Sequence, residues 1–279
     1  PEMSRGLGDV YKRQEYRPGQ KKLVSDVYRT IMRQKLLFMQ APTGVGKTIS
    51  TIFPAVKAVG EELADRIFYL TAKTITATVA KETFALFEKN GYRAKTIQIT
   101  AKEKLCPCDE MECNPVTCPY AKGHFDRVND AVFDLLHRCE MIERDDILSQ
   151  ADRYTVCPFE LCLDTASWCD NIICDYNYVF DPNVYLKRFF QEGIKGDYIF
   201  LIDEAHNMVE RSRQMYSAQI YKEDFLTVKR IMKEHSHSIE KALEKCNKIL
   251  LGMKRECENY TVYDLSLIHI SEPTRHLRI

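Results

Sequence analysis

A glycine-rich loop near the start of the chain has the residue types of a phosphate-binding site. It is the segment Ala41-Pro-Thr-Gly-Val-Gly-Lys-Thr48. Its glycines allow backbone amide groups to point at phosphate oxygens, and the helix expected from Thr48 adds the positive end of its dipole. Lys47 can reach the β- and γ-phosphates, and the Thr48 hydroxyl is a hard oxygen ligand for Mg2+. The loop predicts a nucleotide site formed by Thr43, Gly44, Val45, Gly46, Lys47 and Thr48.

A pair of carboxylates follows a second apolar run. Tyr198-Ile-Phe-Leu-Ile202 has the length of a buried parallel strand, and the sequence Asp-Glu-Ala-His comes directly after it. Asp203 could hold the Mg2+ that Thr48 also binds, and Glu204 could orient the attacking water. His206 is a candidate relay between hydrolysis and the rest of the protein. Alone, such a pair is a common strand cap, but with the loop it predicts an ATPase with catalytic residues Lys47, Asp203, Glu204 and His206.

Cysteines are concentrated between these two motifs. Nine of the eleven lie between Thr48 and Asp203, an interval longer than a compact βαβ core needs, so we expect an inserted segment there. Five of them could form a ligand set: Cys106, Cys108, Cys113, Cys118 and Cys157. Disulfides are not expected, because nothing resembles a signal peptide and a phosphate-loop ATPase belongs in a reducing compartment. A zinc site formed by the first four thiolates and an iron–sulfur cluster both fit the composition.

Four segments together resemble the motifs of one helicase family. They are Tyr16-Arg-Pro-Gly-Gln20, the loop at 41–48, Leu70-Thr-Ala-Lys-Thr74 and the Asp-Glu-Ala-His sequence at 203–206. In this combination the chain is similar to superfamily 2 helicases of the iron–sulfur XPD/DinG type, from about residue 15 to about residue 265. The resemblance implies a RecA-like P-loop domain with an inserted iron–sulfur cluster domain and the start of a helical arch domain.

The resemblance also implies roles for single residues. Arg17 and Gln20 would contact the adenine of ATP. Thr71, Lys73 and Thr74 would contact the backbone of single-stranded DNA, although capping of the following helix is an alternative role for the threonines. A [4Fe–4S] cluster is favoured over zinc, with the ligands Cys106, Cys113, Cys118 and Cys157, and with Cys108 as the alternative to Cys113.

Short apolar runs alternate with helical stretches. We expect strands at 36–40, 66–71, 94–100, 172–174 and 198–202, and helices at 73–90 and 120–138. This alternation is typical of an α/β fold with a parallel sheet covered on both faces. Residues 221–258 are strongly charged and have helical periodicity, so we expect a helical insertion there.

Domain boundaries follow from these patterns. We expect the motor domain at 15–100 and 169–210, with the cluster insertion at 101–168 between its two parts. The arch domain would begin at 211–265. The ends at 1–14 and 266–279 lack the periodicity of their neighbours and look like translated sequencing-adapter sequence, so we expect them to be non-native and the rest to be an internal fragment.

Composition limits the class of protein. With 279 residues and 45% hydrophobic content, the chain can bury one sizeable core plus an insertion. No apolar run approaches the length of a transmembrane helix, so we expect no membrane partner. We further expect a monomer in the bacterial cytoplasm. The formal net charge of zero does not exclude nucleic acid, because a strand-binding groove needs only local lysines and arginines.

These observations predict an ATP-dependent DNA helicase with ATP, Mg2+ and a [4Fe–4S] cluster as cofactors. Its partners would be single-stranded and forked duplex DNA, and by resemblance it would move 5′ to 3′ in DNA repair or replication. The alternative is a zinc-stabilised nucleic-acid-binding ATPase module without unwinding activity. A small-molecule kinase is disfavoured because the Asp-Glu-Ala-His sequence has no role there. By resemblance, arginines from a second motor domain complete the ATP site, so residues 15–265 alone should bind nucleotide weakly and hydrolyse it poorly.

Overall fold

The computed structural model describes residues 16–42, 44–258 and 260. Thr43 and the tails at 1–14 and 266–279 lie outside the described residues, so what the sequence predicts for them stays a prediction. The chain divides into two compact units, with the boundary between Tyr216 and Ser217. The first unit carries the predicted nucleotide motifs and the cysteine-rich segment.

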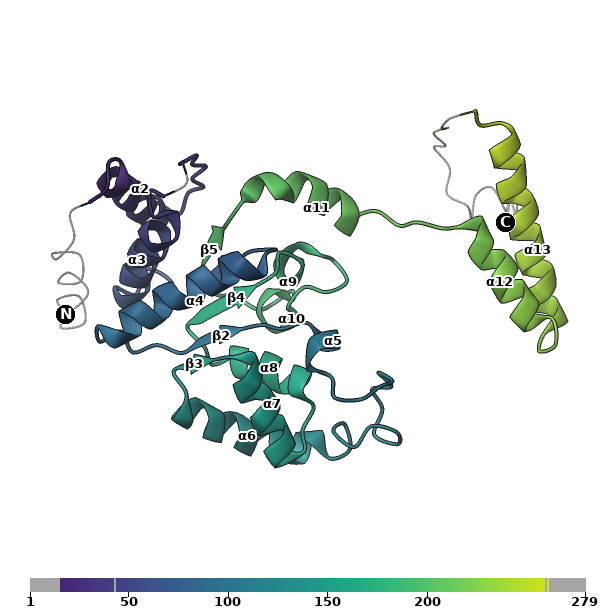
Figure 1. The fold of residues 1–279 in the computed structure, drawn as a ribbon, viewed down its shortest axis with the longest axis horizontal. Coiled ribbons are helices and arrows are strands. Elements are labelled where there is room, and N and C mark those ends of the chain that lie inside the picture. Colours follow the sequence, from purple (N-terminus) through teal and green to yellow (C-terminus); the bar gives the residue numbers. More distant parts are fainter. Residues whose placement is uncertain (1–15, 43, 259, 261–279) are drawn as a thin grey trace, which may run out of the picture. The chain divides into compact units, whose positions relative to one another are not determined.

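A parallel sheet organises the first unit (Figure 1). Its strands are β1 (Arg66–Leu70), β2 (Thr96–Gln98), β3 (Met141–Ile142), β4 (Asn171–Cys174) and β5 (Tyr198–Ile202). They lie in the order β3-β2-β4-β1-β5, and every neighbouring pair is parallel. The predicted α/β class with a parallel sheet is confirmed.

The strand predicted at 36–40 is absent, so that prediction is wrong. This segment is not in a strand, and its Leu36 and Phe38 side chains are each 87% exposed. Among the described residues, no strand pairs with the outer edge of β5. Apolar sequence favours a strand only where a hydrogen-bonding partner is in place.

Helices cover both faces of the sheet. Those of the first unit are α2 (Gln20–Met32), α3 (Lys47–Gly60), α4 (Thr74–Lys89), α5 (Lys102–Leu105), α6 (His124–Arg138), α7 (Arg144–Tyr154), α8 (Pro158–Ala166), α9 (Asn177–Phe180), α10 (Lys187–Phe190), η1 (Ala205–Asn207) and α11 (Met208–Met215). Alternate residues of β1 point to opposite faces. Ile67 and Tyr69 join the core formed with α3 and α4, whereas Phe68 and Leu70 join the core formed with α6, α7 and α8.

The helix predicted at 73–90 is present as α4, but its apolar side chains divide between core and surface. Ala77, Ala80, Phe84 and Phe87 are buried, at the spacing of one helix face. Ile75, Val79 and Leu86 are exposed among the described residues. Several apolar stripes are available on this helix, and packing against the sheet selects one of them.

Phe68 is at the centre of an aromatic cluster. It is buried, stacks on Phe200 at 5.4 Å, and meets Phe189 and Tyr198 edge to face at 5.3 and 5.4 Å between ring centroids. We expect Phe68→Leu to lower the free energy of unfolding by about 1–2 kcal/mol, because it removes ring contacts that a smaller side chain cannot replace. Urea unfolding measures this. The control is Phe133→Leu on the exposed face of α6, and equal losses in the two variants would contradict the prediction.

The second unit is helical, as predicted. It contains α12 (Lys222–Met232) and α13 (His237–Arg255). Ser236 caps α13 by accepting a hydrogen bond from the Ile239 N–H at 3.5 Å, and Lys229 Nζ of α12 lies 3.4 Å from Glu244 Oε2 of α13. None of the helices in the described parts of the chain is long and apolar enough to cross a membrane.

Candidate nucleotide site and cysteine-rich insertion

The glycine-rich loop leads directly into α3. Gly44 and Gly46 flank Val45 and have φ values of +87° and +80°, a left-handed conformation that glycine adopts without a Cβ clash. Lys47 begins α3, and its Nζ donates to the Ala41 carbonyl at 3.3 Å. The lysine therefore folds back over the loop at the N-terminus of a helix, which is the arrangement expected for binding phosphate.

Arg17 and Gln20 meet the same loop from the start of α2. The Arg17 guanidinium donates to the Gly44 carbonyl, and the Arg17 N–H donates to Gln20 Oε1 at 3.1 Å. Gln20 is 8% exposed, and a Cβ added at Gly46 would lie 3.1 Å from its Nε2. A side chain at position 46 would therefore displace Gln20. Both residues predicted to contact adenine lie against the loop.

The two carboxylates follow β5 at the carboxyl end of the sheet. The Asp203 N–H donates to the Leu70 carbonyl at 3.0 Å, so Asp203 continues the pairing of β5 with β1. Burial raises the pKa of Asp203 above its usual value, the charge of Glu204 raises it further, and the charge of Lys47 acts in the opposite direction. The structure therefore brings Lys47 and Asp203, from distant parts of the chain, within electrostatic range of each other.

Glu204 has an unusual backbone conformation. Its φ is +49°, in the left-handed region that non-glycine residues seldom occupy. Such conformations cost energy and are frequent at functional sites. Glu204 Oε2 lies 3.4 Å from Nδ1 of the exposed His206, which is in η1. The turn after β5 thus places the predicted water-orienting residue beside the predicted relay.

Two tyrosines outside the predicted nucleotide motifs are associated with Asp203. Tyr69 is buried in β1, where burial and the charge of Asp203 raise the pKa of its hydroxyl. The hydroxyl of Tyr176, which is buried at the start of α9, donates to the Asp203 carbonyl. The only sequence signal for such a residue is a tyrosine near the carboxyl end of an otherwise apolar strand, and this signal is weak.

The predicted DNA contacts lie in the turn between β1 and α4. Thr71 is buried, its hydroxyl is hydrogen-bonded to that of Thr76, and it accepts a hydrogen bond from the Lys73 N–H at 3.3 Å. Lys73 and Thr74 are exposed. The Thr71 hydroxyl therefore serves the local turn, and Lys73 and Thr74 are the residues accessible to a ligand.

The four predicted cluster ligands are not gathered at one point. Among the described residues, no group of three or more histidine, cysteine, aspartate or glutamate side chains is arranged to hold a metal ion. Every cysteine is a free thiol. Cys106 and Cys113 instead donate to nearby carbonyls, those of Cys108 at 3.9 Å and Met111 at 3.7 Å. As observed, the thiols do not form a closed metal site.

The cysteines lie in two neighbouring sets. Partial burial and hydrogen bonds with Cys118 and Cys106 raise the pKa of Cys108 to about 11. Cys113 belongs to a different set: it is hydrogen-bonded to Lys102, whose pKa is raised by this bond and by the charge of Cys157. Cys108 and Cys113, the two alternatives for one ligand position, are therefore held in different sets.

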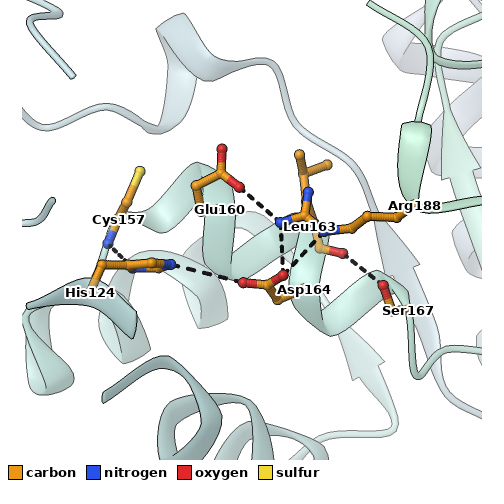
Figure 2. Close-up of polar contacts among 7 residues, drawn as sticks. All are labelled: His124, Cys157, Glu160, Leu163, Asp164, Ser167 and Arg188. Atoms are coloured by element: carbon orange, nitrogen blue, oxygen red, sulfur yellow. Dashed lines mark hydrogen bonds and ion pairs between the residues drawn. The ribbon is translucent and has the colours of Figure 1, made fainter. Parts of the chain in front are cut away.

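A polar network holds the backbone at Cys157 (Figure 2). The Cys157 N–H donates to His124 Nδ1 at 3.2 Å, and His124 Nε2 lies 3.9 Å from Asp164 Oδ2. Arg188 of α10 donates to Asp164 at 2.7 Å and to Glu160 at 2.9 Å. Burial lowers the pKa of His124, which agrees with a neutral ring that accepts at Nδ1. The network joins α8, which begins directly after Cys157, to a segment preceding β5.

Loss of the Arg188 guanidinium should weaken this connection. We expect Arg188→Met to lower the free energy of unfolding by about 1 kcal/mol, because charge-assisted hydrogen bonds are lost between side chains that are only partly buried. Arg213→Met is the control, since Arg213 pairs only loosely with Glu210, at 3.8 Å on the surface of α11. Urea unfolding compares the two variants, and a smaller loss for Arg188→Met than for Arg213→Met would contradict the structural role of the network.

Comparisons with known proteins agree on one family. The sequence model of the DEAD_2 family matches residues 82–225. The chain is 23% identical over 225 residues to the general transcription and DNA repair factor IIH helicase subunit XPD/RAD3 of Saccharomyces cerevisiae, covering 68% of this chain and 28% of that protein. A stretch of 76 residues is 28% identical to the Fanconi anemia group J protein homolog of Gallus gallus, covering 27% of this chain and 6% of that protein.

Solved structures share the fold. One described as XPD_Helicase has a TM-score of 0.59 at 17% identity, covering 92% of this chain and 45% of that one. Another, described as Truncated XPD, has a TM-score of 0.55 at 17% identity, covering 89% of this chain and 71% of that one. The family match covers more than half of the chain, and the XPD relatives agree with it. The protein belongs to the DEAD_2 family of XPD/DinG-type superfamily 2 helicases.

Proposed function

We propose that this chain provides the first motor domain of an ATP-dependent DNA helicase that moves along single-stranded DNA. The observation that carries the proposal is that Lys47, which begins α3 after the glycine-rich loop, and Asp203, which follows β5, lie within electrostatic range of each other. Arg17 and Gln20 lie against the same loop, at the position expected for nucleotide contacts. The chain spans 28% of the length of the yeast relative, so the activity of a complete helicase is part of the proposal.

Each side chain of the nucleotide site has a proposed role. Lys47 binds the β- and γ-phosphates, Thr48 and Asp203 hold Mg2+, and Glu204 orients the attacking water. His206, which contacts Glu204, relays the state of the site to the rest of the protein. The oxygen donors of Thr48 and Asp203 suit Mg2+, which typically keeps several waters and few protein ligands. When bound, the ion supplies positive charge that offsets charge developing on the phosphates.

The domain organisation is proposed on the same basis. The motor domain would comprise 15–100 and 169–210, with a cysteine-rich domain at 101–168. A helical arch domain would begin at 211–265, and the observed boundary between compact units, at Tyr216, supports a change of domain near there. We propose that Cys106, Cys118 and Cys157, with Cys113 or Cys108, bind a [4Fe–4S] cluster. Their free thiol state, and the interactions of Cys108 with Cys106 and Cys118 and of Lys102 with Cys113 and Cys157, support this.

The DNA partner and the setting complete the proposal. Lys73 and Thr74, exposed at the start of α4, would contact the backbone of single-stranded DNA. By family resemblance, movement is 5′ to 3′ and leads to separation of forked duplexes in DNA repair or replication. Free thiols and a phosphate-binding loop suit a reducing compartment, which we take to be the bacterial cytoplasm. We also take the protein to be a monomer.

The test uses the product of the uninterrupted gene that contains this sequence. We expect ATP hydrolysis stimulated by single-stranded DNA and displacement of one strand from a forked duplex. If DNA stimulates hydrolysis but no strand is displaced under any fork geometry, the protein is the alternative, a nucleic-acid-binding ATPase without unwinding activity. Hydrolysis that does not respond to DNA would contradict both functions.

A further inference from the structure

Two segments leave the sheet at the same level, one after β4 and one after β5. Both strands are parallel neighbours of β1, and Leu70 of β1 is in register with the last residue of each, Cys174 and Ile202. The two segments therefore begin together at the carboxyl end of the sheet. The segment after β4 starts with Asp175 and Tyr176, and the segment after β5 is the turn that carries the two predicted catalytic carboxylates.

Tyr176 connects these two segments. Its ring is buried in the core formed with α6, α7 and α8, and its hydroxyl donates a hydrogen bond to the Asp203 carbonyl. This carbonyl belongs to the same planar peptide group as the Glu204 N–H. The Asp203 N–H is held as well, because it donates to the Leu70 carbonyl at 3.0 Å. The Tyr176 hydroxyl therefore restrains the peptide that joins the two carboxylate residues.

Glu204 needs this restraint because of its backbone conformation. Its φ is +49°, and non-glycine residues persist in the left-handed region only where the surrounding structure holds them. On its other side, the Glu204 carbonyl accepts a hydrogen bond from the Asn207 N–H at 2.9 Å. Peptide groups on both sides of Glu204 are thus hydrogen-bonded, and they set the direction in which its side chain leaves the turn. Loss of either bond would allow the turn to relax to a commoner conformation and move the carboxylate.

The start of α9 is itself fixed, so the Tyr176 hydroxyl is held in place. Asp175 Oδ1 accepts a hydrogen bond from the Asn177 N–H at 2.9 Å, and Asp175 Oδ2 accepts one from the Arg211 guanidinium at 3.0 Å. Arg211 is in α11, which follows the same turn through η1. The two residues that follow β4 therefore hold the turn at its first residue and at the helix beyond it.

We propose that Tyr176 is a positioning residue for ATP hydrolysis, holding the turn so that the Glu204 carboxylate can orient the attacking water. This inference rests on the proposed nucleotide site and on the role proposed there for Glu204. Tyr176 acts through the backbone of the turn, whereas nucleotide binding depends on the glycine-rich loop and Lys47. Loss of the hydroxyl should therefore affect the chemical step and not the binding of nucleotide. A displacement of about 1 Å in an active site can lower the rate by about 100-fold.

The test compares Tyr176→Phe with Tyr178→Phe in the product of the uninterrupted gene, with saturating single-stranded DNA. Tyr178 is in α9 and is buried in the same core as Tyr176, so each variant removes one hydroxyl from a matched ring. We expect Tyr176→Phe to lower kcat about tenfold with KM within about twofold, and Tyr178→Phe to leave both within about twofold. A fluorescent ADP analogue, whose binding needs no hydrolysis, should bind both variants as it binds the unaltered protein. Circular dichroism checks that both are folded.

Arg211→Met weakens the same restraint and carries the test if Tyr176→Phe does not fold. It releases Asp175 from α11 and leaves the Tyr176 ring unchanged, so we expect kcat to fall about threefold at unchanged KM. Arg213→Met is its control, because Arg213 is on the surface of the same helix and pairs only with Glu210 at 3.8 Å. This control should keep both constants.

Other outcomes would overturn one of the two claims. An unchanged kcat in Tyr176→Phe, or in Arg211→Met where that variant carries the test, would refute the positioning role and leave the nucleotide site intact. Equal falls in Tyr176→Phe and Tyr178→Phe would also refute it, because the effect would then be one of general packing. If Glu204→Gln hydrolysed ATP as fast as the unaltered protein, the role proposed for Glu204 would itself be wrong. Absence of hydrolysis by the unaltered protein would overturn the proposed function.

Discussion

Lys47→Ala is expected to weaken binding of Mg2+·ATP by at least about 100-fold, or ~2.7 kcal/mol. The reason is that its ammonium group lies at the glycine-rich loop, where Nζ is 3.3 Å from the Ala41 carbonyl and its charge acts on Asp203. Removing one member of a hydrogen-bonded charge pair at a binding site typically costs about 2–5 kcal/mol. Fluorescence titration or calorimetry with the full chain measures the loss directly, without needing hydrolysis.

Lys57→Ala provides a matched control on the same helix. Lys57 is in the last turn of α3, where it pairs with Glu61 at 3.6 Å and lies over the Tyr28 ring. Its loss changes the net charge of the chain by the same amount, but far from the loop along α3. We expect Lys57→Ala to bind nucleotide within about twofold of the unaltered chain. Similar affinity losses in the two variants would mean that overall charge, and not the loop lysine, governs binding.

The places of the glycine-rich loop and of the acidic pair in the fold were predictable because their signals are local in sequence. The two glycines, the lysine and the threonine are adjacent residues, and the structure places Lys47 at the first position of α3 as the motif requires. The acidic pair likewise follows a short apolar strand, β5, whose bounds agree with the prediction. Four strands were found within two residues of their predicted ends, since each combines apolar or β-branched residues with a clear boundary.

What could not be predicted depends on contacts between distant segments. The run at 36–40 has the composition of a strand, yet whether it pairs is decided by the edge of β5 and not by its own residues. β3 contains two residues, too few to show any periodicity. The Tyr176 hydroxyl reaches the Asp203 carbonyl, and Arg188 reaches Asp164, each from another part of the chain. Local propensity carries no information about such pairs.

The arrangement of the cysteines depends on a bound group as well as on the chain. Without one, thiols take up local hydrogen bonds, as Cys106 and Cys113 do with nearby carbonyls. Metal ligation requires deprotonated thiols and supplies the free energy that gathers the ligands, so without it no strong interaction draws the four thiols to one point. The separation of the cysteines into two sets is therefore the expected state of the polypeptide alone. A direct measurement of metal content therefore decides whether these cysteines bind a cluster.

Protein purified without oxygen is expected to contain about four iron atoms per chain and to absorb visible light, as a [4Fe–4S] cluster held by four thiolates does. Cys118→Ser should lose nearly all of this iron, whereas Cys246→Ser on α13, in the other compact unit, should keep it. Stoichiometric zinc without iron would instead support the zinc-stabilised module.

Cys108→Ser and Cys113→Ser then identify the fourth ligand. The pKa of Cys108 is raised by interaction with Cys118 and Cys106, whereas Cys113 and Cys157 raise the pKa of Lys102. A cluster ligated by Cys106, Cys113, Cys118 and Cys157 takes two thiolates from each set, so it requires the two sets to close on each other. A cluster that uses Cys108 in place of Cys113 takes three from one set and requires only Cys157 to approach. Iron loss confined to Cys113→Ser would establish the first arrangement, and loss confined to Cys108→Ser the second. Full iron content in both variants would show that neither thiol is a required ligand and would overturn the proposed ligand set.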